Sequence, residues 1–211
     1  YLIDPFVENR EKLAEEYRRI TGVKPECFST LEDFLLRKPD FDAGVIVTPA
    51  KTHYKIAKAV LQAGKHVFVE KPFTTSLKDA ETLVHLASKK NLHVVIGTNR
   101  TVFPAYRTAA NALKNGLIGE LQAISFYYKH AWEENTKGNW RQDPKEEGSG
   151  LLADHSPHYN HFLFTDLGFK PKEIIHLGTR FNKKGVDVDV CYKLVDKKAR
   201  VAFILLNGSP S

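Results

Sequence analysis

The sequence predicts an α/β fold in two parts: a doubly wound parallel sheet, followed by an α+β domain with a mostly antiparallel open sheet. Up to about residue 100, short apolar runs alternate with amphipathic helical segments through short connections, which is the pattern of parallel β-α-β units. Beyond that point, apolar strands follow one another with short turns between them, as in antiparallel hairpins. We therefore expect one domain at residues 1–100 and a second at residues 101–211.

The first domain opens inside an apparent strand that ends at Asp4 and Pro5. Its helical segments carry apolar residues three and four positions apart, and two of them are closed by Gly22 and Gly64. The expected helices are residues 9–20, 30–36, 54–63 and 76–90, and the expected strands are residues 44–47, 67–69 and 93–97. The glycine-rich phosphate loop that precedes the Asp4 position in dinucleotide-binding folds is absent. We interpret the sheet as a Rossmann-type sheet, incomplete at its N-terminus, in a portion of a longer protein.

The second domain is expected to start with an amphipathic helix at residues 103–114, closed by Asn115 and Gly116. The expected strands are residues 121–129, 173–181, 186–195 and 200–206. Short polar turns at residues 183–185 and 196–198 join the last three of them, so we expect these three to pair antiparallel.

The composition is that of an ordinary globular protein, with 42% hydrophobic and 27% charged residues in 211. No apolar run approaches the length of a membrane span, which argues against a membrane partner. The net charge is +6, but the basic residues are scattered as pairs among acids, so we expect no nucleic-acid partner. Cys27 and Cys191 lie far apart and form neither a zinc motif nor a disulfide framework, which fits a reducing cytoplasm.

Polar residues and proline follow two consecutive strands of the predicted parallel sheet. Thr48 and Pro49 follow the first, and Glu70, Lys71 and Pro72 follow the second. Ligands of open α/β sheets bind beyond the carboxyl ends of the strands, so a nucleotide along this edge would explain both. A cis Lys71–Pro72 bond would aim the lysine amine. The alternatives are ordinary turn chemistry and a strand end with two solvated charges.

Asp4 follows the first strand at the position where a dinucleotide-binding fold places the acid that binds the adenosine ribose. Its charge would favour NAD over NADP, because a 2′-phosphate would face a carboxylate. The alternative is that Asp4 only opens the turn before Pro5.

A second polar constellation begins with the glycine loop Gly148-Ser149-Gly150 and runs into an expected helix that starts near Asp154. Asp154 and His158 are then four residues apart on one helix face. A carboxylate bonded to one imidazole nitrogen leaves the other as a base that works near neutral pH. Two alternatives stay open: a metal site made with His161, and a capping Asp beside a core His.

Taken together, the motifs resemble those of the Gfo/Idh/MocA oxidoreductase family. They are Thr48-Pro49 with His53, Glu70-Lys71-Pro72, residues 115–119 (Asn-Gly-Leu-Ile-Gly), Trp140-Arg141, and Gly148, Gly150, Asp154 and His158. Their order and spacing carry the resemblance through nearly the whole chain. Ser149 departs from it, because glycine is usual there.

The resemblance implies a Rossmann domain plus a C-terminal α/β domain whose open sheet makes homodimer or homotetramer contacts. It implies that Glu70 and Lys71 lie beside the nicotinamide ribose, with a cis proline, and that Asp154 and His158 are the catalytic pair. The expected cofactor-binding residues are Asp4, Thr48, Pro49, His53, Glu70, Lys71 and Asn99, the expected substrate residues are His130, Trp140, Arg141 and His158, and no metal is expected.

The expected reaction is hydride transfer between NAD(P), with NAD preferred, and a secondary alcohol of a sugar or polyol. His158 would take the hydroxyl proton, Asp154 would orient the imidazole, and Lys71 would stabilise the developing alkoxide. The alternatives are a glycosidase that uses bound NAD transiently and a non-catalytic NAD-sensing regulatory protein. Retention of both Lys71 and His158 argues against the sensor.

Overall fold

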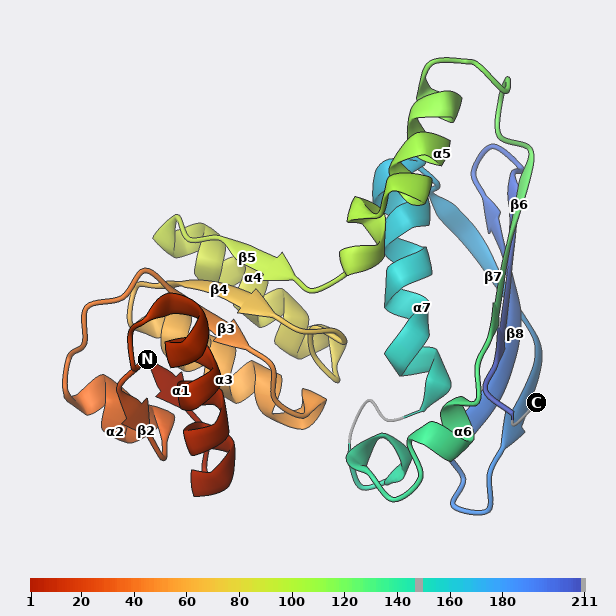
Figure 1. The fold of residues 1–211 in the computed structure, drawn as a ribbon. Helices are drawn as coiled ribbons and strands as arrows, with labels where there is room; N and C mark the ends of the chain where they lie inside the picture. The colour runs from red at the N-terminus through yellow and green to blue at the C-terminus, as the bar shows by residue number, and fades with distance from the viewer. Residues whose placement is uncertain (147–149, 210–211) are drawn as a thin grey trace.

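The structure, a computed structural model, describes residues 1–146 and 150–209. Its first part contains parallel strands in two groups, β1 with β2 and then β3-β4-β5 in that order (Figure 1). The strands are β1 (Leu2–Ile3), β2 (Cys27–Phe28), β3 (Ala43–Ile46), β4 (His66–Val69) and β5 (Val94–Ile96). The helices between them are α1 (Val7–Thr21), α2 (Leu31–Leu36), α3 (Ala50–Gln62) and α4 (Leu77–Lys90).

The predicted strand-helix alternation of this part is confirmed. Val67 and Val69 of β4 pack with Leu61 of α3 and Leu83 of α4 in one apolar cluster. On the other face, Val45 keeps 71% of its surface exposed. Helices α3 and α4 therefore cover one side of β3-β4-β5.

The second part is a four-stranded mixed sheet of order β6-β9-β8-β7, in which β6 pairs parallel with β9 and the other pairs are antiparallel. The strands are β6 (Ala123–Lys129), β7 (Pro171–Phe181), β8 (Asp187–Asp196) and β9 (Val201–Asn207). The helices are α5 (Pro104–Lys114), α6 (Trp132–Asn135) and α7 (Leu151–His161), with 3₁₀ turns η1 (Asn99–Val102) and η2 (Trp140–Gln142) and a π-helical end η3 (Phe162–Asp166).

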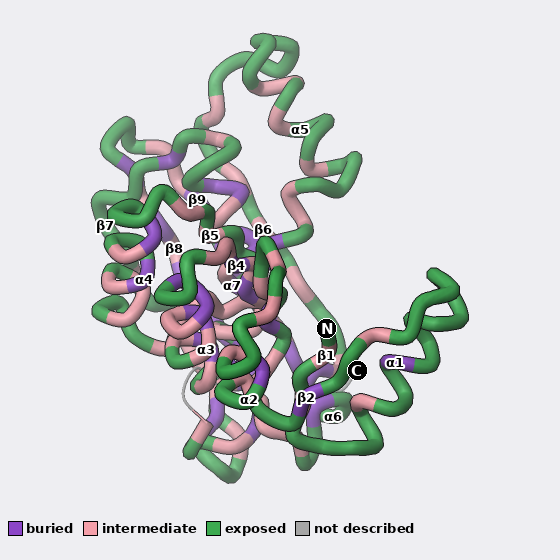
Figure 2. The backbone as a smooth tube through the Cα atoms, turned by 90° about the vertical axis from the view of Figure 1, so that its left-hand side faces the viewer, coloured by how far each residue is buried: buried purple, intermediate pink, exposed green. Residues whose placement is uncertain are grey.

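Helix α7 lies against one face of this sheet (Figure 1). Leu151 and Tyr159 of α7 are buried in one cluster with alternate residues of β8 and β9, such as Val188 and Ile204. Buried positions gather there and around α3 and β4, whereas α1 and α5 are mostly exposed (Figure 2). No helix in residues 1–146 and 150–209 is long and apolar enough to cross a membrane.

Helix α7 begins earlier than the sequence predicts. It starts at Leu151, so Pro157 lies inside the helix and not in its first turn. The cause is a distant residue, because the carboxylate of Asp187 on β8 accepts a hydrogen bond from Leu152 N at 2.7 Å. That bond satisfies a backbone donor in the first turn, as a cap does.

Gly150 is expected to be irreplaceable at the start of α7. Its φ is +105°, and a Cβ there would collide with the Asp187 carboxylate. We expect Gly150→Ala to lower the free energy of unfolding by about 2–4 kcal/mol, since strained backbone and a displaced capping carboxylate act together. Gly168→Ala is the matched control, with φ +59° and nothing within 4 Å of the added Cβ. Equal urea midpoints for the two variants would contradict the proposed collision.

Candidate active site

Lys71 joins the two parts of the molecule. It follows β4, and its ammonium reaches α7, where Nζ donates to the Asp154 carbonyl oxygen at 2.7 Å and forms an ion pair with Asp154 Oδ1. The side chains of Lys71 and Asp154 keep only 15% and 13% of their surface exposed. The Lys71–Pro72 peptide bond is cis, as the proline signal suggested. Lys71 is therefore not one of two solvated charges at a strand end.

The Asp154 carboxylate is held on both oxygens. Oδ1 pairs with Lys71, and Oδ2 accepts a hydrogen bond from Trp132 Nε1 at 2.8 Å. The Arg141 Nε lies 3.6 Å from Oδ2. Burial alone would raise the pKa of Asp154, but the Lys71 ammonium and the Trp132 N–H outweigh it, so the pKa lies below its ordinary value. The carboxylate is therefore ionised at neutral pH.

The expected bond between Asp154 and His158 does not form. His158 is only 7% exposed, and in the part of the chain that the structure describes its buried Nδ1 has no hydrogen-bond partner. Spacing of four residues does place both groups on α7, but Lys71 and Trp132 occupy the carboxylate oxygens. Burial first, and then the charges of Lys71 and Arg100, lower the pKa of His158 to about 4.

His155 is a site residue that the sequence analysis missed. Its Nε2 lies 3.5 Å from Asp154 Oδ2, and its ring centroid lies 4.1 Å from that of Tyr128 on β6. Its Nδ1 is buried without a partner among the described residues. Burial lowers the pKa of His155 to about 4 despite the nearby Asp154 carboxylate. Its position directly after Asp154 was the available signal.

The lowered pKa values of His155 and His158 predict a loss of stability in mild acid. Each has a pKa of 6.5 when unperturbed and about 4 when folded, so the unfolded chain binds more protons between these values. Their contribution is complete above pH 6.5 and is lost as the pH falls toward 4. The pair should cost on the order of 2–4 kcal/mol, and urea midpoints between pH 7 and 4.5 measure it. His155→Phe should flatten the dependence, and a flat wild-type curve would contradict it.

Residues from both parts line a cavity of about 200 Å³. Its lining comprises Val47, Thr48, Pro49, Glu70, Lys71, Trp140 and Arg141. The cavity therefore brings together the ends of β3 and β4 with the predicted substrate residues of η2. The Arg141 guanidinium carbon lies 4.5 Å from the centre of the Trp140 ring, so these two neighbours form one stacked unit at the wall.

The Glu70 side chain is packed against Gly97, which follows β5. A Cβ at Gly97 would lie 2.7 Å from Glu70 Oε1, so only glycine leaves the carboxylate in place. Glu70 Oε2 also accepts a hydrogen bond from its neighbour Lys71 N at 3.1 Å. The result is a fixed carboxylate at the cavity wall, which suits a ligand that offers hydroxyl groups.

His53 lies behind this cavity and is not part of its lining. The ring is 1% exposed, with Nε2 2.8 Å from the Thr48 carbonyl oxygen and Nδ1 2.8 Å from that of Pro72. Both ring nitrogens are thus used within the protein. His53 is expected to bind the cofactor, and with both ring nitrogens against protein carbonyl oxygens that role stays a prediction.

The other predicted residues lie outside the cavity lining. Asp4 caps its own turn, accepting from Phe6 N at 2.8 Å, which is the alternative that the sequence left open; its carboxylate also accepts from Asn9. Asn99 is exposed at the start of η1. His130 is exposed after β6. Gly148 and Ser149 fall outside the described residues, so the departure at Ser149 has no structural account.

Further contacts hold α7 and β6 to the segment that follows β5. The Arg100 guanidinium carbon lies 4.9 Å from the Tyr159 ring centre and 5.5 Å from that of Tyr128. His161 Nδ1 is hydrogen-bonded to Thr98 Oγ1. The structure therefore gives His161 a protein partner, and within residues 1–146 and 150–209 no three His, Cys, Asp or Glu side chains are grouped to hold a metal ion.

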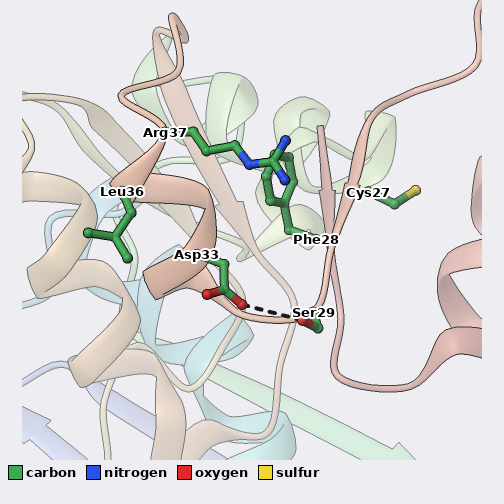
Figure 3. A pocket seen from close by; sticks show the side chains of 6 residues that line it. All are labelled: Cys27, Phe28, Ser29, Asp33, Leu36 and Arg37. Carbon is green, nitrogen blue, oxygen red and sulfur yellow. Dashed lines mark hydrogen bonds between the residues drawn. The ribbon is translucent and has the colours of Figure 1, made fainter.

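A second hollow, of about 350 Å³, lies between β2 and α2 (Figure 3). Its lining comprises Cys27, Phe28, Ser29, Asp33, Leu36 and Arg37. The Arg37 guanidinium is stacked 5.1 Å from the Phe28 ring centre, and Ser29 is hydrogen-bonded to Asp33 at 3.4 Å. The lining includes none of the residues that surround Lys71, so the hollow is separate from the candidate site.

A parallel sheet of nucleotide-binding type is joined to a mixed sheet through a largely buried lysine and carboxylate, which is the arrangement of an oxidoreductase with a nucleotide-binding fold. The chain belongs to the Gfo/Idh/MocA family of oxidoreductases. The family model described as "Oxidoreductase family, NAD-binding Rossmann fold" matches residues 2–98, and the "GFO/IDH/MocA C-terminal domain" matches residues 106–202.

Curated relatives agree with this family. The chain is 35% identical over 162 residues to "Uncharacterized oxidoreductase YhhX" of Escherichia coli, covering 70% of this chain and 46% of that protein. It is 31% identical over 157 residues to "1,5-anhydro-D-fructose reductase" of Ensifer adhaerens, covering 72% and 46%. The chain thus spans about half the length of the curated relatives it matches.

Solved structures share the fold at low identity. The WlbA dehydrogenase from Bordetella pertussis, solved with NADH and UDP-GlcNAcA, matches with a TM-score of 0.80 at 20% identity, covering 99% of this chain and 58% of that one. Myo-inositol 2-dehydrogenase from Lactobacillus plantarum matches with a TM-score of 0.79 at 16% identity, covering 98% and 68%. The predicted fold class is confirmed.

Proposed function

We propose that this protein transfers a hydride between NAD and a secondary alcohol of a sugar or polyol. One observation carries the proposal: Lys71, at the wall of the strand-end cavity, is bonded across the domains to Asp154. His158 follows one helical turn after Asp154 and keeps a buried, unpartnered Nδ1 within the part of the chain that the structure describes. A cation, a base and a cofactor cleft are the parts that alcohol oxidation requires.

In this scheme His158 accepts the hydroxyl proton. Its lowered pKa keeps the imidazole neutral at neutral pH, so a lone pair is available. The Lys71 ammonium donates to the same oxygen and stabilises the alkoxide charge. Asp154 holds Lys71 in place through Oδ1, so its role is to orient the lysine and not the histidine. The bound nicotinamide ring supplies the hydride acceptor.

The residues of the cavity fit a nicotinamide nucleotide. Glu70 offers a fixed carboxylate to ribose hydroxyl groups, and Thr48 and Pro49 supply the wall at the end of β3. Asp4 would reach the adenosine ribose from the end of β1 and would favour NAD over NADP. Its local bonds to Phe6 and Asn9 fix the direction of the carboxylate. Asn99, at the start of η1 after β5, and His53 complete the proposed cofactor set.

We assign the substrate to the side of the cavity formed by Trp140 and Arg141, and we keep His130, exposed after β6, among the proposed substrate residues. Aromatic rings and a guanidinium fork suit the faces and hydroxyl groups of a sugar. Names among the relatives support this class, including 1,5-anhydro-D-fructose reductase and UDP-N-acetylglucosamine 3-dehydrogenase.

The test uses the protein in its full natural length. Absorbance of reduced nicotinamide is followed with NAD and then NADP across polyols, sugars and sugar nucleotides. Signal with NAD and one such compound is the expected result. Silence across the panel, with NAD still bound, would overturn the proposal; glycoside cleavage without net NADH would then identify a glycosidase, and no reaction a sensor.

We also propose that the chain divides into two domains near residue 100 and that the protein is cytoplasmic.

A further proposal concerns the partner, which we infer to be a second copy of the chain. The sheet face opposite α7 carries Tyr127, Phe203 and Leu205 with exposed fractions of 65%, 41% and 38%. Tyr127 and Leu205 are direct neighbours across β6 and β9. Such an apolar face favours burial against an identical face in a homodimer or homotetramer. Sedimentation of Leu205→Lys against wild type tests it; an unchanged oligomeric mass would contradict it.

A further inference from the structure

His53 connects the two loops that form the cofactor side of the cavity. The residue lies in the first turn of α3, and its ring is 1% exposed. One nitrogen contacts the carbonyl oxygen of Thr48 after β3, and the other contacts that of Pro72 after β4, each at 2.8 Å. Both loops contribute residues to the cavity wall, so one ring fixes the separation of its two sides.

The contact with Pro72 bears directly on Lys71, because the two residues share a peptide bond. A shift of the Pro72 carbonyl moves the Lys71 backbone and therefore the origin of its side chain. The Lys71 ammonium must span from β4 to Asp154 on α7, where its bond to the Asp154 carbonyl oxygen is 2.7 Å long. A small backbone displacement is enough to break a bond of that length.

We propose that His53 is a positioning residue that acts through Pro72 and aims Lys71 at Asp154. The inference rests on the proposed function for its catalytic consequence, but the placement of Lys71 itself does not. Carbonyl oxygens only accept hydrogen bonds, and a neutral imidazole carries a single N–H, so the ring donates to one of the two carbonyl oxygens and lies against the other. The two contacts can be removed one at a time with amide side chains of different length.

Three variants separate the two contacts. In His53→Asn the amide nitrogen takes the place of Nδ1 and keeps the Pro72 contact, whereas in His53→Gln it takes the place of Nε2 and keeps the Thr48 contact. His53→Leu removes both at similar volume. If His53 acts on Lys71 through Pro72, then His53→Asn should resemble wild type. His53→Gln and His53→Leu should weaken the contact between Lys71 and Asp154.

The readout is the rate at which an amine-reactive acylating reagent modifies Lys71, followed by mass spectrometry of the digested protein without substrate. Lys58 of α3, whose Nζ is hydrogen-bonded to Tyr54 Oη at 3.2 Å, is the internal standard. We expect the rate of Lys71 modification, relative to that of Lys58, to rise several-fold in His53→Gln and His53→Leu. In His53→Asn it should change little. Where activity is measurable, kcat should fall about 10- to 100-fold in Gln and Leu with little change in KM.

Equal Lys71 modification in Asn and Gln would overturn the proposal. If His53→Leu fails to fold, all its lysines will react faster together. The comparison of His53→Asn with His53→Gln then decides the question alone. A merely structural role would lower the thermal midpoint of Asn and Gln alike without a selective change at Lys71. Selective release of Lys71 in a protein that oxidises no alcohol would leave the positioning role standing and remove only the proposed function.

Discussion

Lys71→Met is expected to lower turnover by about 10²–10³-fold, the loss typical of removing one donor to a developing oxyanion. Methionine preserves most of the side-chain length and removes the ammonium group that pairs with the Asp154 carboxylate. The loss should appear in kcat, because the lysine acts on charge that develops during the reaction.

The same substitution leaves the Asp154 carboxylate buried without its ammonium partner, with 13% of its surface exposed. Breaking a buried pair on one side costs about 3–5 kcal/mol of stability, and here Trp132 and Arg141 reduce that cost. The double variant Lys71→Met with Asp154→Asn should regain stability, because no unpaired charge remains, but not activity. This control separates unfolding from loss of catalysis.

The measurement is a double-mutant cycle over Lys71 and Asp154, with kcat and urea midpoints for each variant. Recovery of both stability and turnover in the double variant would show that Lys71 serves only to neutralise Asp154. Full turnover in Lys71→Met alone would remove Lys71 from the chemistry altogether.

The parts of the fold that local signals determine were predictable. Helix α4 is capped at its start by Ser76, whose hydroxyl accepts from Asp79 N at 3.2 Å, and at its end by Asn91 with φ 55°, both recognisable cap residues. Strand β8 follows from the alternation in its sequence and β9 from a continuous apolar run, and in both strands every second residue is buried. In these segments the information lies within a few residues of the element.

What the sequence could not supply are contacts between distant segments. Asp187 determines where α7 starts from 35 positions away, and Lys71 meets Asp154 across 83. The predicted bond from Asp154 to His158 rested on helical spacing alone, and Lys71, which follows β4, occupies the carboxylate instead. Spacing identifies which side chains share a face, but the competition for one carboxylate is decided by what packs opposite.

His158→Ala is expected to lower turnover in alcohol oxidation by about 10²–10⁴-fold, the usual contribution of a positioned base. Affinity for NAD should change little, because His158 is not part of the cavity lining around Glu70 and Thr48. His155→Phe is the comparison: the ring stack on Tyr128 is kept, and the imidazole beside Asp154 is lost. We expect a much smaller loss in that variant.

The pH profile of kcat/KM distinguishes the two histidines further. A base must be neutral to accept a proton, so oxidation should be lost as the pH falls through about 4, where burial and the neighbouring cations place the pKa of His158. Because burial lowers the pKa of His158, the acidic limb of the profile should lie well below pH 6.5. In His155→Phe the limb should remain, because His158 is intact. If instead His155→Phe removes the limb and most of the turnover while His158→Ala keeps both, then His155 is the base, and its position beside the Asp154 carboxylate becomes the catalytic pair.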